Sequence, residues 1–194
     1  MVGNIRESLR AGLIKRRERL DPIEVGQLSD KICRRMMLLD EYRYAKHVAL
    51  YHAVRGEIVL DRIWRAAPMH GKYCYFPICF GDELKFVPAT PANEFVANKY
   101  GILEPKVDIS KAIEPNALDL VLTPLVAFDP FGVRIGMGKG YYDRAFSKLS
   151  SDGPVLMGVA YQFQKQSFLP LQSWDVLLHG TLTESNLYWT NRVT

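Results

Sequence analysis

The stretch LDLVLTPLVAFDPFGVRIGMGKGYYDR, residues 118–144, decides the fold that we predict. Residues 118–128 form an apolar run typical of a strand that is buried on both faces of a sheet. A glycine-rich loop follows directly, and we expect a helix at about 139–150. Ligands of open α/β sheets bind beyond the carboxyl ends of the strands, which is where this loop begins.

Elsewhere in the chain, apolar runs alternate with amphipathic segments. Ile5, Leu9 and Leu13 recur at helical spacing, and Asp21 followed by Pro22 is typical of a helix N-terminus. This alternation predicts an α/β protein, a three-layer α/β/α arrangement around a mostly parallel central sheet, as a single domain over residues 1–194. We expect helices at 4–20, 22–39 and within 55–67, strands at 45–54, 71–79, 82–89 and 153–161, an edge strand at 179–189, and loop with short pieces of structure at 90–117.

The composition is that of an ordinary soluble globular chain. Of 194 residues, 48% are hydrophobic and 24% are charged, and the formal net charge of +4 suits anionic small molecules and nucleic acid alike. No apolar run is long enough for a transmembrane helix, and the N-terminus lacks the apolar core of a signal peptide. The three cysteines are too few for a disulfide framework and lack the CxxC spacing of a zinc site. We expect reduced, mostly buried thiols in a cytoplasmic protein, at Cys33, Cys74 and Cys79.

The glycine-rich loop matches neither of the two common nucleotide-binding motifs. A P-loop requires GxxxxGK followed by Ser or Thr, and the dinucleotide fingerprint is GxGxxG, whereas residues 136–140 read GMGKG. The loop is therefore either a structural turn or a phosphate cradle, in which open backbone, a helix N-terminus and the charges of Arg134 and Lys139 bind an anion. Asp143 lies in the first turn of the helix, where it either complements the helix dipole or holds Mg²⁺.

Residues 128–144 also resemble the signature of a known family, the 5-formyltetrahydrofolate cyclo-ligases or methenyltetrahydrofolate synthetases. The family pattern is Phe-Asp, a Gly, then Arg-Leu-Gly-x-Gly-x-Gly-Tyr-Tyr-Asp-Arg, and only Ile135 departs from it, as a conservative replacement of Leu. The resemblance covers nearly the whole chain, through IRESLRAGLIKRRERL (5–20), RGEIVLDRIW (55–64), YGILEP (100–105) and PLQSWDVLLHGTLTE (170–184).

This resemblance implies that the protein converts 5-formyltetrahydrofolate to 5,10-methenyltetrahydrofolate while ATP becomes ADP and phosphate. The formyl oxygen would attack the γ-phosphate to form an iminium phosphate, which N10 of the folate then closes into a ring. The enzyme's task would be positioning and charge neutralisation, as in other phosphoryl transfers.

The resemblance places the ATP phosphates in the glycine-rich loop and brings two arginines of the first helix to the nucleotide. Without it, Arg6 and Arg10 would be interpreted as a solvated helix face. Arg134 and Lys139 are the expected catalytic cations, but many family members have Gly at the position of Lys139, so this lysine would assist rather than be required. The implied ATP-binding residues are Arg6, Arg10, Arg134, Ile135, Gly136, Met137, Gly138, Lys139, Gly140, Tyr141 and Tyr142.

The metal and folate positions also come from the resemblance. Asp143 and Asp175 would hold Mg²⁺ against the phosphates. Glu57 would bind the N–H donors of the reduced pterin, although by itself it would be interpreted as an acid at a helix N-terminus. His52 would line the folate pocket, and Tyr141 would either cover the folate or pack against its own helix.

Two other functions remain alternatives at this stage. A phosphate- or nucleotide-binding relative of the same fold, without the reaction, would have no need of both Glu57 and an intact 134–143 motif. A nucleic-acid binder would be expected to carry an RNA-reading aromatic motif, which the chain lacks. The expected partners are thus 5-formyltetrahydrofolate and its polyglutamates, with ATP as co-substrate, and neither nucleic acid nor membrane. We expect a monomer.

Overall fold

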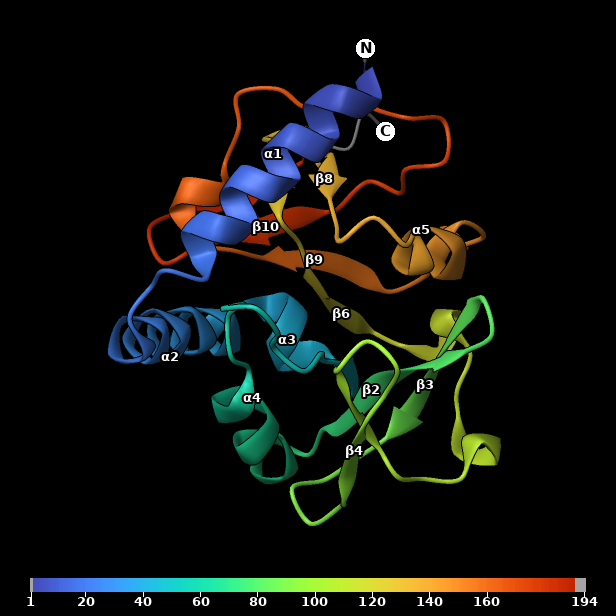
Figure 1. The fold of residues 1–194 in the computed structure, drawn as a ribbon. Coiled ribbons are helices and arrows are strands. Elements are labelled where there is room, and N and C mark those ends of the chain that lie inside the picture. Colours follow the sequence, from blue (N-terminus) through green and yellow to red (C-terminus); the bar gives the residue numbers. More distant parts are fainter. Residues whose placement is uncertain (1, 191–194) are drawn as a thin grey trace.

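A computed structural model describes residues 2–190, and it is built around one seven-stranded sheet (Figure 1). The strand order is β11-β10-β9-β6-β1-β2-β3. The five inner strands are parallel, and the edge strands β3 and β11 run antiparallel to their neighbours. The strands are β1 (His47–Ala49), β2 (Tyr73–Phe80), β3 (Glu83–Pro88), β6 (Leu120–Pro124), β9 (Val155–Val159), β10 (Gly180–Leu182) and β11 (Leu187–Trp189). The predicted α/β class with a mostly parallel central sheet is confirmed.

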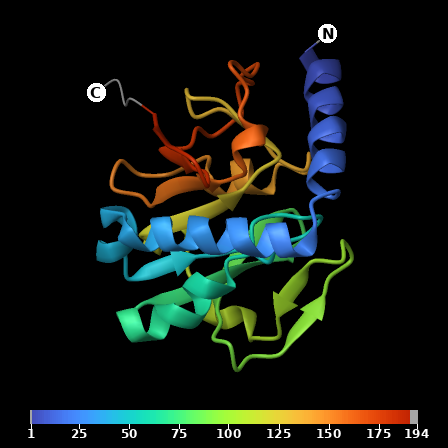
Figure 2. The same ribbon diagram turned by 90° about the vertical axis from the view of Figure 1, so that its left-hand side faces the viewer.

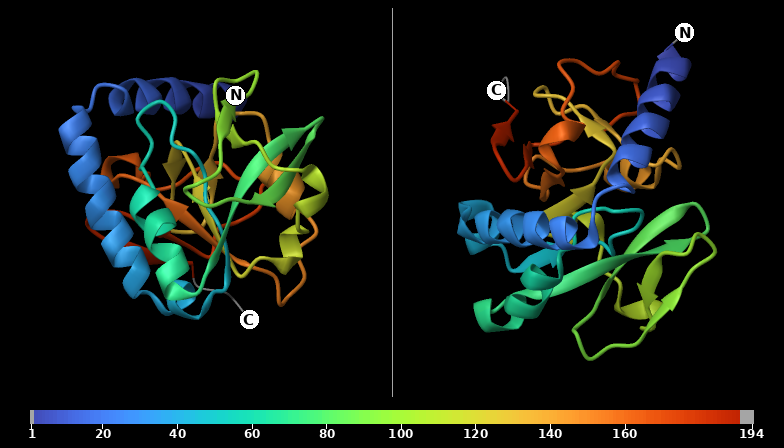
Figure 3. Two further views of the ribbon diagram at one scale, coloured as in Figure 1. Left: turned by 90° about the horizontal axis from the view of Figure 1, so that it is seen from below. Right: turned by 60° about the vertical axis from the view of Figure 1, so that its left-hand side comes forward.

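Helices lie on both faces of the sheet (Figure 3). One face packs against α2 (Pro22–Leu38), α3 (Asp40–Tyr44) and α4 (Asp61–Ala66), through a core that includes Ile32, Met36 and Ile63. The other face packs against the short α5 (Tyr141–Phe146), through Phe146. Helix α1 (Val2–Arg17) stands at the carboxyl end of the sheet, where Leu9 and Leu13 pack on a third small core (Figure 2).

The strand order places a topological switch point between β1 and β6. The chain leaves β1 toward α4 on one face, and it leaves β6 toward α5 on the other. The segments that follow these two neighbouring strands therefore diverge at the carboxyl edge, and such switch points are where open α/β sheets bind ligands. Residues 52–57 and the glycine-rich loop both lie beyond this edge, because they follow β1 and β6.

Several element bounds differ from the predicted ones. Helix α2 begins as predicted, with Asp21 as N-cap accepting a hydrogen bond from the Ile23 amide at 2.8 Å. Helix α1 ends three residues earlier than predicted, and α5 covers only six residues of the expected 139–150 helix. Of the predicted strand 45–54, only β1 pairs, and residues 50–54 continue as loop. The single edge strand expected at 179–189 is wrong, because the segment forms the antiparallel pair β10–β11.

The chain between 89 and 119 forms short elements, as predicted. It contains the hairpin β4 (Phe95–Ala97) and β5 (Leu103–Pro105) and the 3₁₀ turns η2 (Ile109–Lys111) and η3 (Pro115–Ala117). Two more 3₁₀ turns, η1 (Ala67–His70) and η4 (Gln162–Gln164), follow α4 and β9. No helix within residues 2–190 has the length and apolar character needed to cross a membrane. The three cysteines are free thiols, and Cys33 and Cys74 are buried as expected.

Candidate active site

A two-stranded ribbon delivers the glycine-rich loop to the carboxyl edge of the sheet. Strand β7 (Ala127–Phe128) pairs antiparallel with β8 (Arg134–Ile135), and the turn between them is built around Asp129. The buried Asp129 carboxylate accepts hydrogen bonds from the amides of Phe131 and Val133, each at 3.0 Å, and of Leu169 at 2.9 Å. The aspartate of the motif is thus a structural anchor, a role that the sequence analysis did not assign.

The loop itself, residues 136–140, is held open by glycine backbone and by the first helix. Gly138 has φ +96° and Gly140 has φ +66°, values that side chains rarely tolerate, and Gly140 is the N-cap of α5. Arg10 donates from Nε to the Gly136 carbonyl at 2.9 Å. The helix α1 therefore contacts the loop directly, and the predicted proximity of Arg10 to the loop is present.

Arg134 lies at the centre of the site and is 6% exposed. Its Nη2 donates to Asp143 Oδ1 at 2.7 Å, and its Nη1 donates to the Val176 carbonyl. Burial lowers the pKa of Arg134, and the nearby carboxylates of Asp143 and Asp175 oppose that effect. The guanidinium thus stays charged beside Asp143 and Asp175, two acids that lie far from each other in the sequence.

Asp175 is brought to the loop by Arg6. Arg6 Nη1 donates to Asp175 Oδ2 at 2.7 Å, and its Nη2 donates to Oδ1 at 3.2 Å, so the ion pair is bidentate. The same Nη2 donates to the Arg134 carbonyl at 3.1 Å. Arg6 and Asp175 have side chains that are 14% and 6% exposed, so this pair is partly desolvated and not a solvated helix face.

The donors at this point fit a magnesium ion bound together with phosphates. Mg²⁺ in nucleotide sites uses one or two carboxylates, with substrate oxygens and waters completing the shell. Asp143 and Asp175 supply two carboxylates around Arg134. Within residues 2–190 no group of three or more His, Cys, Asp or Glu side chains could hold a metal by itself. The protein groups would therefore hold the ion only in company with a nucleotide.

The remaining predicted ATP residues surround the loop in different ways. Lys139 is exposed, and its Nζ lies 5.8 Å from the centroid of the Tyr100 ring. Met137 is also exposed, whereas the Ile135 side chain is fully buried in the core under α1 and can offer a ligand only backbone. Tyr141 donates to the Gly81 carbonyl at 3.2 Å, with the hydroxyl of Tyr100 3.4 Å away.

Tyr142 connects the glycine-rich loop with the second predicted subsite. Burial raises the pKa of this phenol, the charge of Glu57 raises it further, and the charge of Arg134 lowers it. Its hydroxyl is therefore within electrostatic reach of both Glu57 and Arg134. The structure brings the predicted nucleotide residues and the predicted folate residue to the same edge of the sheet.

Glu57 is 5% exposed and is paired with an arginine that sequence reasoning missed. Arg17, the last residue of α1, donates from Nη2 to Glu57 Oε1 at 3.3 Å, and the Val54 amide donates to Oε2 at 3.1 Å. Burial raises the pKa of Glu57, and the charge of Arg17 opposes the rise. A buried acid of this kind is not a solvated helix N-terminal acid; α4 begins only at Asp61.

His52 lies in an aromatic cluster. Its ring is 4.9 Å from the Phe76 centroid, 4.5 Å from that of Phe95 and 5.9 Å from that of Trp64. Burial lowers the pKa of His52, so the ring is held neutral, and its Nε2 is buried without a hydrogen-bond partner among the described residues. The cluster offers flat apolar walls with one free polar atom.

Two hydroxyls near this edge were also missed. The buried oxygens of Tyr51 and Thr123 lack hydrogen-bond partners within the part of the chain that the structure describes. Tyr51 follows β1, and Thr123 is the penultimate residue of β6, the neighbouring strand. Orphaned buried polar atoms are uncommon in folded proteins, and here they belong to the two neighbouring chain segments at the switch point.

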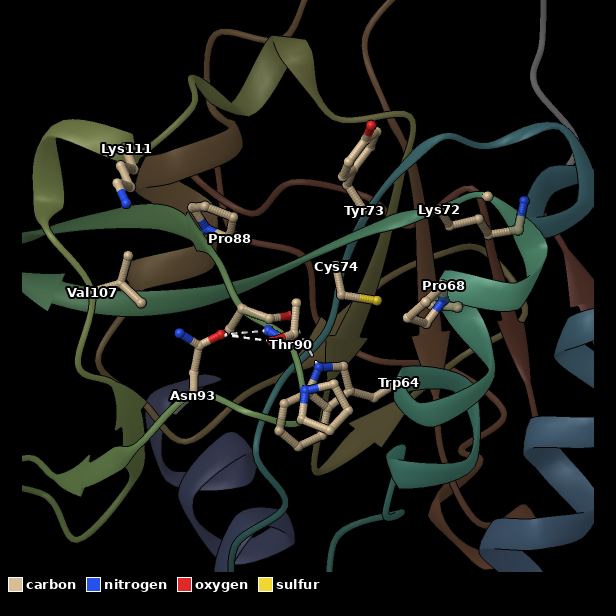
Figure 4. A pocket seen from close by; sticks show the side chains of 14 residues that line it. Trp64, Pro68, Lys72, Tyr73, Cys74, Pro88, Thr90, Asn93, Val107 and Lys111 are labelled. Atoms are coloured by element: carbon tan, nitrogen blue, oxygen red, sulfur yellow. Dashed lines mark hydrogen bonds between the residues drawn. The ribbon is translucent and has the colours of Figure 1, made fainter.

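A cavity of about 490 Å³ lies elsewhere, near the first residues of β2 and the last of β3 (Figure 4). Tyr73, Cys74, Pro88 and Trp64 are among its lining residues, and none of the predicted site residues lines it. Lys72 belongs to the lining, but its amine donates to the Ala45 carbonyl at 2.6 Å. The cavity lies toward the amino end of the sheet, and Trp64 belongs both to its lining and to the aromatic cluster around His52.

Comparisons with known proteins identify the family of this chain. The sequence profile of the 5-formyltetrahydrofolate cyclo-ligase family matches residues 2–184. A 5-formyltetrahydrofolate cyclo-ligase of Haemophilus influenzae is 34% identical over 183 residues, 91% of this chain and 96% of the relative. One from Escherichia coli K12 is 32% identical over 181 residues, 90% of this chain and 97% of the relative.

The comparison with solved structures identifies the same kind of enzyme. The solved structure of Aquifex aeolicus 5,10-methenyltetrahydrofolate synthetase superposes with a TM-score of 0.85 at 30% identity, covering 98% of this chain and 95% of that one. A 5,10-methenyltetrahydrofolate synthetase from Mycoplasma pneumoniae superposes with a TM-score of 0.75 at 28% identity, covering 92% and 98%. With a profile match over nearly its whole length and these relatives, the chain belongs to the 5-formyltetrahydrofolate cyclo-ligase family.

Proposed function

We propose that this protein catalyses the ATP-dependent cyclisation of 5-formyltetrahydrofolate to 5,10-methenyltetrahydrofolate, giving ADP and phosphate. The observation that carries the proposal is the meeting of two unlike subsites at one sheet edge. The glycine-rich loop with buried Arg134 follows β6, the buried carboxylate of Glu57 follows the neighbouring strand β1, and the charges of both act on the Tyr142 phenol. A module that bound only phosphate would have no use for the Glu57 carboxylate.

We propose that the reaction passes through a phosphorylated formyl group. The formyl oxygen attacks the γ-phosphorus, so that an O–P bond forms and the bond to ADP breaks. The lone pair of N10 then attacks the resulting iminium carbon, the C–O bond breaks, phosphate leaves with its electron pair, and N10 loses its proton. Because the nucleophiles belong to the substrates, the protein mainly has to align them and neutralise charge.

Charge neutralisation falls to the groups around the loop. We assign Arg6, Arg10 and the backbone of residues 135–142 to the ATP phosphates, with Arg134 as the central cation. Arg134 is held by Asp143 and the Val176 carbonyl, so its position is set before the nucleotide binds. Pre-positioned charges cost little reorganisation when charge develops during phosphoryl transfer. Lys139 is exposed and can reach the outer phosphates as an assisting cation.

We propose that Asp143 and Asp175 hold Mg²⁺ when the nucleotide binds. The ion would offset charge on the phosphate oxygens. Support comes from the two carboxylates near Arg134, each of which is oriented by an arginine: Arg134 pairs with Asp143, and Arg6 pairs with Asp175.

We assign the folate to the region beyond the carboxyl end of β1. Glu57 would accept hydrogen bonds from N–H donors of the reduced pterin, and His52 and its aromatic neighbours would pack against the flat rings. Tyr141 and Tyr100 stand beside the loop, where they can cover the bound folate. Polyglutamate forms are included as substrates because Lys99 and Lys139, both near Tyr100, present cations to an anionic tail. We further propose a single-domain, monomeric, cytoplasmic enzyme, in keeping with its free thiols.

The test is the growth of the methenyltetrahydrofolate absorbance band with purified protein, 5-formyltetrahydrofolate and Mg-ATP. Growth that requires ATP is the expected result. Glu57→Gln should raise the KM for the folate alone, and Arg134→Ala should lower kcat/KM for ATP. A flat trace from protein that is folded and binds ATP would refute the proposed reaction, and would favour a phosphate-binding relative of the same fold.

A further inference from the structure

We propose that Arg17 is a positioning residue for folate binding, because it holds the Glu57 carboxylate in the orientation that accepts the pterin. This inference rests on the role proposed for Glu57. Arg17 is 1% exposed, and each of its three guanidinium nitrogens donates a hydrogen bond. Nε donates to the Arg55 carbonyl at 2.8 Å, Nη1 to the Leu125 carbonyl at 3.0 Å, and Nη2 to Glu57 at 3.3 Å.

The hydrogen bonds to Glu57 leave it with the right number of free acceptor sites. An ionised carboxylate has about four lone-pair sites, two on each oxygen. Arg17 occupies one site on Oε1 and the Val54 amide occupies one on Oε2. One site remains on each oxygen, which is what a pair of adjacent N–H donors on a pterin edge requires. Loss of Arg17 would leave Oε1 without this partner and free the carboxylate to rotate.

The backbone around Glu57 is fixed by the same helix end. Gly56 has φ +74°, and a Cβ at that position would lie 2.7 Å from the Arg17 carbonyl oxygen. Arg55 has φ +52°, a strained value for a residue other than glycine, and its carbonyl accepts from Arg17. Tyr161 donates to the Gly56 carbonyl at 3.0 Å. The tight turn that carries Glu57 is therefore built against the last turn of α1.

Arg17 also supplies the charge that opposes protonation of Glu57. Burial raises the pKa of Glu57, and Arg17 is the first of the groups that lower it. The other charged or titratable groups that face Glu57 are Arg55, Tyr51, Tyr142 and Tyr161. Burial raises the pKa of each of these tyrosines, so they stay neutral near pH 7. Arg55 is half exposed and already paired with Glu18, which leaves Arg17 as the main buried cation.

The experiment is the pH profile of the KM for 5-formyltetrahydrofolate, measured beside the KM for ATP. In the wild type, folate KM should rise as pH falls through the raised pKa of Glu57. Arg17→Met should raise folate KM about 10- to 100-fold near pH 7, the range expected for a lost hydrogen bond to a charged group. In Arg17→Met, the rise in folate KM should also occur at a higher pH than in the wild type, while the KM for ATP changes little. Arg17→Lys keeps the charge and should return the pH profile toward that of the wild type.

Two further variants, Glu57→Gln and the double variant Arg17→Met/Glu57→Gln, complete the experiment. Glu57→Gln has no carboxyl to titrate, so its profile reports the titration of the substrate itself. Arg17→Met leaves a buried unpaired acid, which destabilises the fold, whereas Arg17→Met/Glu57→Gln removes both buried charges. If Arg17 acts through Glu57, the double variant has the folate KM of Glu57→Gln alone. Circular dichroism checks the fold of each variant.

The outcomes separate this inference from the proposed function. The inference is wrong if Arg17→Met keeps the wild-type pH profile, or if it raises folate KM by the same factor with and without Glu57. It is also wrong, together with the role of Glu57, if Glu57→Gln leaves folate KM unchanged. No methenyl absorbance from the wild type would instead contradict the proposed reaction itself.

Discussion

Replacing Gly136 and Gly138 by alanine, one at a time, should move the melting temperature in opposite directions. Both glycines belong to the same loop, two residues apart. Gly138 has φ +96°, and an added Cβ would lie 3.4 Å from Arg10 Cζ, an ordinary contact. Gly136 has no left-handed φ and nothing within 4 Å of an added Cβ. The two substitutions therefore differ in backbone strain and hardly in packing.

The magnitudes follow from that difference. An alanine forced into a sparsely populated backbone region costs about 1–3 kcal/mol. A Gly→Ala change at a compatible position stabilises by about 0.4–1 kcal/mol, because the unfolded chain has less entropy to lose. For a chain of this length, 1 kcal/mol shifts Tm by roughly 2–4 °C. We expect Tm to fall by about 2–12 °C for Gly138→Ala and to rise by about 1–4 °C for Gly136→Ala.

Thermal denaturation followed by circular dichroism, without ligand, measures both shifts. A fall for Gly136→Ala as large as that for Gly138→Ala would refute the strain argument. The KM for ATP then tests the function of the loop in the stabilised variant. If backbone at Gly136 approaches a phosphate, Gly136→Ala should raise the KM for ATP although the protein is no less stable. An unchanged KM would favour a structural turn at this position.

Three other substitutions or treatments have definite expected results. Asp129→Ala removes the acceptor of three amides, two of them in buried hydrogen bonds, and should lower the free energy of unfolding in urea by roughly 2–5 kcal/mol. KM values should be unchanged, and a large rise in KM would contradict a purely structural anchor. Arg134→Ala should reduce kcat/KM about 100- to 1000-fold if it is a transition-state cation. Its loss should also destabilise the fold by about 3–5 kcal/mol through the unpaired Asp143, so Arg134→Ala/Asp143→Asn should recover stability and not activity. Chelation by EDTA should abolish the reaction and Mg²⁺ restore it, with Asp175→Asn requiring more Mg²⁺; activity in EDTA would refute the metal assignment.

The fold was predictable from the sequence for those elements whose hydrophobic pattern and end points are both set by neighbouring residues. The β2–β3 hairpin, with Gly81 at the turn, and the capped start of α2 depend on neighbouring residues alone. The prediction for 179–189 failed because a turn within the apolar pattern was overlooked. Thr183 Oγ1 accepts from the amides of Asn186 at 2.9 Å and Ser185 at 3.3 Å, which reverses the chain between β10 and β11. The TESN sequence at 183–186 carried that signal, since Ser, Thr and Asn favour such turns.

The site was predictable only in part for a different reason. The charged residues of the motif lie within ten positions of one another, so their proximity follows from local sequence. Arg6 and Asp175 are 169 positions apart, and their pairing follows from where α1 packs, which no local pattern indicates. The orphaned hydroxyls of Tyr51 and Thr123 are likewise defined by tertiary burial. A resemblance to a family supplied both Arg6 and Asp175 in advance, but it supplied neither their pairing nor the two hydroxyls.

The geometry of α1 explains why one helix serves both subsites. At about 100° per residue, Arg10 lies about 40° and Arg17 about 20° around the helix from Arg6, so all three point from one face. Arg6 and Arg10 contact the glycine-rich loop and Asp175, while Arg17, about 16 Å further along at 1.5 Å per residue, contacts Glu57. Arg17 belongs to the basic run KRRER (15–19), and such a cluster of charges suggests a solvated surface. The helical spacing of Arg17 from Arg6 is the signal that could have distinguished it from the other residues of this run. A cation that recurs on the helix face packed against the protein has to be buried and paired.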